Sequence, residues 1–118
     1  MRYNVEEIER TANEIRYRLD FPATSGFFAG HFPGNPILPG VAQVQICIEV
    51  LAKSLARPVH LRKLESVRYR RPITPETVCE LTVQLPDDEG RVVFRLGCSE
   101  GLVADGRMLL VTEGSDDV

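Results

Sequence analysis

The sequence lacks several features that mark membrane, secreted and nucleic-acid-binding proteins. It has no apolar run of about 18 residues, and its first residues do not show the basic-then-apolar order of a secretory signal. The net charge of −3 argues against a nucleic-acid partner, because affinity for phosphate comes largely from clustered Lys and Arg. We therefore expect a cytoplasmic protein that binds no nucleic acid and inserts into no membrane.

Cysteine and histidine are also scarce. The three cysteines, Cys47, Cys79 and Cys98, are widely spaced and form no C-x-x-C pair, so we expect structural thiols. His60 has no neighbour at a spacing typical of metal ligands. The sequence thus predicts no metal site and no cofactor.

What is present indicates one domain of mixed structure. The 118 residues, 43% of them hydrophobic, fit a single domain over 1–113, and we expect a disordered tail over 114–118. The absence of Gly and Pro from 41–56, with apolar residues on nearly every side, predicts a buried helix. We expect Asn4 to cap a helical turn through Ile8, and strands over 15–21, 60–71, 76–85, 91–98 and 102–112. One helix and a run of antiparallel strands predict an α+β fold whose sheet curls around the helix.

The segment from Gly30 to Gly40, GHFPGNPILPG, is the most informative stretch. Its three prolines fix φ and restrict the preceding residues, while its three glycines permit backbone angles that side chains forbid. A flexible linker would lack these prolines. The composition therefore indicates a site that holds His31 and the amides near Gly40 in a defined arrangement.

This turn, followed by an apolar helix and by VRYRRPITP, resembles the FabA/FabZ-type 3-hydroxyacyl-[acyl-carrier-protein] dehydratases. The resemblance implies a hot-dog fold, in which a curved antiparallel β-sheet wraps around one central helix. The short N-terminal part is similar to the compact dehydratases of aryl-polyene-type pathways. The turn residues that carry the likeness are His31, Phe32, Pro33, Gly34, Pro36, Pro39 and Gly40.

The resemblance also implies roles for individual residues. His31 matches the base that removes a proton from C2 of the substrate. The amide of Gly40 or Val41 would polarise the thioester carbonyl from the start of the helix. Phe28, Phe32 and Pro39 would line an acyl tunnel, although packing of the loop against the sheet explains the phenylalanines equally well. A dimer is implied, because the histidine of one subunit faces the helix of the other.

The helix departs from the family pattern at its acidic position. Gln45 stands where the family has the acid, and Glu49 stands one turn later, where the family often has glutamine. Residues four apart share a helix face, so Glu49 is a candidate for the relocated acid. The alternative is that Glu49 forms an ordinary helix salt bridge with Lys53.

A basic run ends in Arg68, Arg70 and Arg71. It suits an acidic acyl carrier protein bearing the acyl-phosphopantetheine thioester, or it is simply the charged face of a strand. We expect a dehydratase of fatty-acid or polyketide/polyene synthesis that forms a homodimer or higher even oligomer, with a heterodimer as the alternative. Two other functions stay open: an inactive acyl-carrier-binding subunit, which Gln45 favours, and a hot-dog thioesterase.

Overall fold

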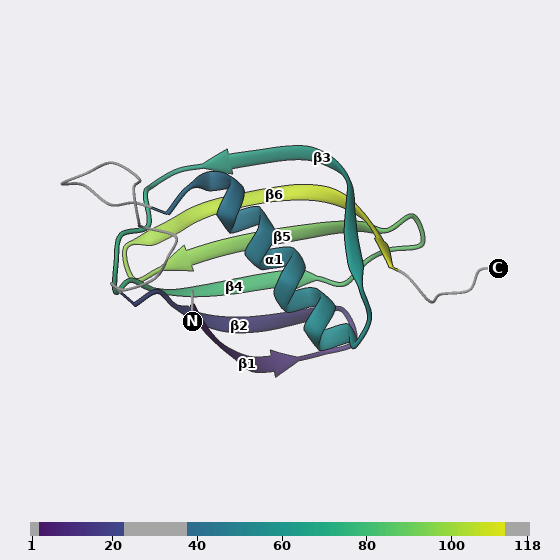
Figure 1. The fold of residues 1–118 in the computed structure, drawn as a ribbon, viewed down its shortest axis with the longest axis horizontal. Coiled ribbons are helices and arrows are strands. Elements are labelled where there is room, and N and C mark those ends of the chain that lie inside the picture. Colours follow the sequence, from purple (N-terminus) through teal and green to yellow (C-terminus); the bar gives the residue numbers. More distant parts are fainter. Residues whose placement is uncertain (1–2, 23–37, 113–118) are drawn as a thin grey trace.

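The computed structural model describes residues 3–22 and 38–112 of the chain. One helix, α1 (Gly40–Leu55), lies across a single antiparallel sheet (Figure 1). The sheet has six strands in the order β1-β2-β4-β5-β6-β3. Their bounds are β1 Asn4–Arg10, β2 Glu14–Asp20, β3 Val59–Tyr69, β4 Val78–Gln84, β5 Arg91–Cys98 and β6 Gly101–Thr112. The predicted α+β architecture, with the sheet curved around one helix, is confirmed.

The predicted helical turn at Asn4 is wrong, because this segment forms strand β1. It pairs antiparallel with β2 from Asn4 opposite Asp20 to Arg10 opposite Ile15, with a bulge between Glu7 and Glu9. Only one of its seven residues, Val5, is even partly buried. The hydrogen bonds to β2 stabilise the extended conformation of this segment. Its sequence does not indicate a strand, because a mostly polar strand at a sheet edge has little alternation of apolar residues.

Helix α1 begins and ends where local chemistry requires. Pro39 has extended angles of φ −60° and ψ 147°, and its ring presets the approach to the first turn. At the other end Ala56 adopts φ 57°, and its amide donates to the carbonyls of Ala52 and Lys53. Pro58 follows shortly and cannot continue the helix.

One face of α1 supplies the core. The buried residues are apolar except for Gln43, and they pack against the inward side chains of the sheet. The predicted buried helix is buried on one face only, because Gln45 is exposed and Val41 is 76% exposed. The fold therefore leaves one stripe of the helix uncovered. The buried residues of α1 are Ala42, Gln43, Val44, Ile46, Cys47, Val50 and Leu51.

Candidate functional site

The first turn of α1 presents backbone amides. Those of Ala42 and Gln43 donate to the Pro39 carbonyl at 3.1 and 3.3 Å. No described residue accepts a backbone hydrogen bond from Gly40 or Val41. The N–H groups of a helix start lack helical partners and lie at the positive end of its dipole. The predicted carbonyl-binding position is therefore chemically suited to a partial negative charge, and its role stays a prediction.

Tyr69, at the end of β3, fixes this helix start. Its phenol donates to the Gly40 carbonyl at 3.0 Å. A Cβ at position 40 would lie 2.7 Å from Tyr69 Cζ, so glycine lets the ring approach this closely and a larger residue would displace it. The Gly40 carbonyl and the Val41 N–H share one peptide plane, so the bond from Tyr69 also orients that N–H. Burial raises the pKa of Tyr69, which keeps the phenol protonated as a donor.

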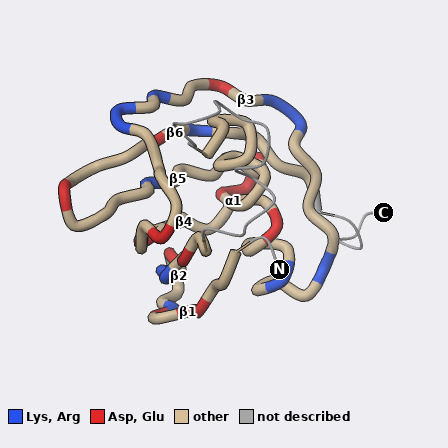
Figure 2. The backbone as a smooth tube through the Cα atoms, turned by 60° about the vertical axis from the view of Figure 1, so that its left-hand side comes forward, with Lys and Arg blue, Asp and Glu red and all other residues tan. Residues whose placement is uncertain are grey.

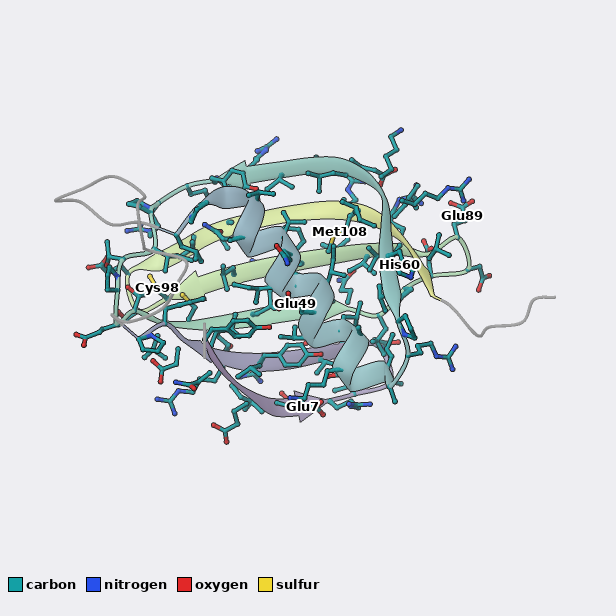
Figure 3. The ribbon with its side chains drawn as sticks, in the orientation of Figure 1. Glu7, Glu49, His60, Glu89, Cys98 and Met108 are labelled. Atoms are coloured by element: carbon teal, nitrogen blue, oxygen red, sulfur yellow. The ribbon has the colours of Figure 1, made fainter. Side chains whose placement is uncertain are left out.

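The polar centre of the uncovered stripe is Glu49. Tyr3 donates to Glu49 Oε1 at 2.8 Å, and Gln45 Nε2 donates to Oε2 at 3.1 Å. Glu49 is half-buried and lies near the middle of the helix (Figure 3). The structure thus brings Gln45 and Glu49 together as the helical spacing predicts, whereas Lys53 is exposed. Glu49 is also the only acidic residue in α1.

Neither tyrosine was found by sequence reasoning. Tyr3 lies far from Glu49 along the chain, next to β1, and no local pattern announces its contact with α1. Tyrosine combines an apolar ring with a polar hydroxyl group, and is therefore suited to such half-buried positions. For Tyr69, the segment VRYRRP places a tyrosine near the end of a predicted strand, where its hydroxyl can reach a carbonyl of a neighbouring element.

A narrow apolar gap lies under the helix. It contains no space large enough for a water molecule. Gln43 Oε1 borders it, is buried, and has no hydrogen-bond partner among the described residues. The gap is lined by Leu19, Phe21, Leu38, Gln43, Ile46, Leu81, Phe94 and Leu96.

The predicted basic patch lies on and just beyond β3, where Figure 2 shows Lys and Arg along the strand. Two of its three residues face carboxylates: Arg70 lies 3.5 Å from Asp105 and Arg71 lies 3.8 Å from Glu100. Arg68 is exposed. Long, exposed ion pairs contribute little stability, so these guanidinium groups can exchange partners easily.

Three predicted site residues, His31, Phe28 and Phe32, lie outside the described residues, as does the predicted tail. Pro39 is half-buried at the start of α1. Within residues 3–22 and 38–112, the structure has no helix of the length and apolarity needed to span a membrane. The same ranges contain no group of three or more His, Cys, Asp or Glu residues placed to hold a metal ion.

Comparisons with known proteins agree with this architecture. In fold, the chain superposes on a chain of "The Dehydratase Heterocomplex ApeI:P from Xenorhabdus doucetiae" with a TM-score of 0.80, 25% identity, and coverage of 91% of this chain and 93% of that one. It also superposes on mouse thioesterase superfamily member 2, with a TM-score of 0.66 and 13% identity over 93% of this chain and 82% of that one. The second likeness concerns the fold alone.

Sequence comparisons are more specific. The 3-hydroxyacyl-[acyl-carrier-protein] dehydratase FabZ of Ehrlichia chaffeensis is 35% identical over an alignment of 99 positions, and the match covers 76% of this chain and 68% of that protein. The FabZ of Syntrophobacter fumaroxidans is 30% identical over an alignment of 114 positions, and the match covers 86% of this chain and 77% of that protein. The family model described as ApeI-like, ApeI dehydratase, matches residues 7–107. The chain therefore belongs to the ApeI-like dehydratase family, a FabA/FabZ-type family with the hot-dog fold.

Proposed function

We propose that the protein eliminates water from a 3-hydroxyacyl thioester carried by an acyl carrier protein, with His31 as base and Glu49 as acid or anchor of the departing water. The observation that carries this proposal is the Glu49 carboxylate, held by Tyr3 and Gln45 on the uncovered stripe of α1. The membership of the dehydratase family supports the reaction type.

The chemistry distributes three tasks. Elimination needs a base at C2, a group that receives or protonates the C3 hydroxyl, and a donor to the thioester oxygen. The Val41 N–H, oriented through Tyr69 and Gly40, suits the donor task. Gln45 has no acidic proton to give, and its amide instead fixes one oxygen of Glu49. Glu49 then takes the second task, with its carboxylate positioned from two sides.

A second subunit would complete the site. Strand β3 ends the sheet order, and its residues Leu61, Leu64 and Tyr69 are 43%, 44% and 49% exposed. A long edge strand with exposed apolar side chains is suited to pairing with another chain. We propose edge-to-edge pairing in a homodimer, with a heterodimer as the alternative. In this arrangement the His31 of one subunit faces the α1 of its partner.

The proposed carrier-protein surface is Arg68, Arg70 and Arg71. Carrier-protein carboxylates would replace Asp105 and Glu100 at Arg70 and Arg71, which costs little because both intramolecular pairs are long and both guanidinium groups are exposed. The bound carrier protein would place its phosphopantetheine arm near the start of α1. Tyr69 lies next to these arginines in sequence, and its hydroxyl donates a hydrogen bond to Gly40 at the start of the helix.

A binding subunit without catalytic activity is the second candidate, because Gln45 occupies the position of the family's acid. The similar structure from Xenorhabdus doucetiae is a dehydratase heterocomplex, ApeI:P, and this supports a division of labour between two different subunits as the alternative arrangement.

Hydration of crotonyl thioesters by the purified protein tests the proposal. We expect hydration by the wild type without release of free thiol, loss of it in His31→Ala, and its retention in the matched histidine variant His60→Ala. Loss of a general base or acid typically costs ~10²–10⁴-fold in rate. An inert wild type that gains hydration in Gln45→Glu would favour the binding subunit instead, and release of free thiol would indicate a thioesterase.

A further inference from the structure

We propose that Cys79 and Cys98 form a thiol modification site, which closes to a cross-strand disulfide on reaction with a low-molecular-weight disulfide. The two residues are direct register partners on the antiparallel strands β4 and β5. Residues directly opposite on such strands point to the same face, with Cβ atoms about 4.5–5.5 Å apart and Cα atoms about 4.5–5.5 Å apart. A disulfide requires Cα atoms about 4.4–6.8 Å apart and Cβ atoms about 3.5–4.5 Å apart, so the Cα spacing already fits and the Cβ atoms must approach each other by roughly 1 Å.

The two thiols differ in access to solvent. Cys79 is only 2% exposed, whereas Cys98 is half-buried at the end of β5 (Figure 3). On the next strand, the register partner of Cys98 is Gly101, which has no side chain to cover it. Cys98 is therefore the thiol that an oxidant reaches first, and Cys79 is the thiol that lies behind it.

The buried position of Cys79 also affects its acidity. Burial, with a smaller contribution from Cys98 itself, raises the pKa of Cys79 to about 12. Burial likewise raises the pKa of Cys47 to about 12, but Cys47 lies in α1 and pairs with neither strand. The third cysteine is thus an internal control.

The reaction balances in two exchange steps. The Cys98 thiolate attacks one sulfur of the small disulfide, forms a mixed disulfide and releases one small thiolate. Cys79 then gives its proton to solvent and attacks the Cys98 sulfur, which expels the second small thiolate. Two protein thiols are oxidised to one disulfide, and one small disulfide is reduced to two thiols. Because Cys79 is mostly protonated at neutral pH, the second step is the slow one and becomes faster as pH rises.

Treatment of the full-length protein with oxidised glutathione, followed by intact-mass and peptide analysis, tests the proposal. The wild type should lose the mass of two hydrogens and yield a peptide linking Cys79 to Cys98. Cys79→Ser should stop at the first step and retain one glutathione on Cys98. Cys98→Ser should give neither product at a comparable rate, and Cys47→Ser should behave like the wild type.

Three outcomes would overturn the proposal. They are a stable glutathione adduct on Cys98 in the wild type as abundant as that in Cys79→Ser, a disulfide that includes Cys47, and a link between two chains instead of within one. The reaction is read directly from mass, so it is independent of whether the protein hydrates thioesters. A thermal melt of each variant before oxidation shows that the compared proteins are folded.

Discussion

The two faces of α1 have different roles, since one packs in the core and the other presents polar groups. The buried face is apolar apart from Gln43 and fills the space between helix and sheet. The uncovered stripe places Val41, Gln45 and Glu49 at successive turns, and its polar groups are tied to Tyr3 and to each other. Burial holds the helix in place, and this fixed position lets the other face present a carboxylate in a defined orientation. Stability and chemistry are thus separable along one helix.

The sharpest test of this separation removes one side chain from each face. Leu51 is fully buried, so Leu51→Ala should lower the free energy of unfolding by about 2–5 kcal/mol through lost burial and a residual cavity. Val41→Ala, on the uncovered stripe, should change it by less than about 0.5 kcal/mol. Urea unfolding of both variants measures the difference. Equal losses would show that a second subunit or another segment buries Val41 as deeply as Leu51.

The glycine at the start of α1, Gly40, provides a second test. Gly40→Ala would force a Cβ to 2.7 Å from the Tyr69 ring, so we expect a loss of about 1–3 kcal/mol in unfolding free energy. The double variant Gly40→Ala/Tyr69→Ser removes the ring, and should lose less than the sum of the two single variants. Additive losses in urea unfolding would contradict the steric explanation.

How much of this arrangement the sequence predicts depends on how local the determining interactions are. The span of α1 follows from Pro39, the missing Gly and Pro, and the apolar pattern, and β5 has the predicted bounds, Arg91–Cys98. Strand β1 was missed because it is defined by pairing with β2 and buries little. The hydrogen bonds from Tyr3 to Glu49 and from Tyr69 to Gly40 could not be predicted either, because they join residues that are distant in sequence.

The cysteines show the same limit. Each was predicted to be a structural thiol, and for Cys47 its full burial agrees with that prediction. That Cys79 and Cys98 face one another depends on the register of β4 against β5, which a spacing along the chain does not reveal. A candidate site of this kind emerges only from the assembled sheet.

A variant with a smaller expected effect distinguishes the contribution of the Tyr69 hydrogen bond from that of the Tyr69 ring. Tyr69→Phe keeps the ring over Gly40 and removes the bond to its carbonyl, at a cost of about 0.5–1.5 kcal/mol in unfolding free energy. If the bond also orients the Val41 N–H, hydration should fall while KM changes little, since the carbonyl donor matters most as charge develops. Steady-state kinetics of Tyr69→Phe measures this, and an unchanged kcat would leave Tyr69 a purely structural residue.

The smallest effect concerns charge away from α1. Arg91 donates to both oxygens of Glu65 at 2.9 and 3.1 Å, and this hydrogen bonding holds the pKa of Glu65 below its ordinary value. The stabilisation is present above the unfolded-state pKa of Glu65 and is lost as pH falls through the lower folded-state pKa. Glu65→Gln should therefore flatten the acid side of a melting-temperature profile and leave hydration unchanged. An unaltered profile would contradict a stabilising role for this pair.

The most direct test of the account is Glu49→Gln, assayed for crotonyl thioester hydration and for urea unfolding in the same preparation. Gln keeps the size of Glu and can still accept a bond from Tyr3, so we expect the unfolding free energy to stay within about 1 kcal/mol of the wild type. Hydration should fall by ~10²–10⁴-fold, because the amide cannot act as an acid. Hydration retained at the wild-type rate would contradict the assignment of Glu49 and of the uncovered stripe as the catalytic face.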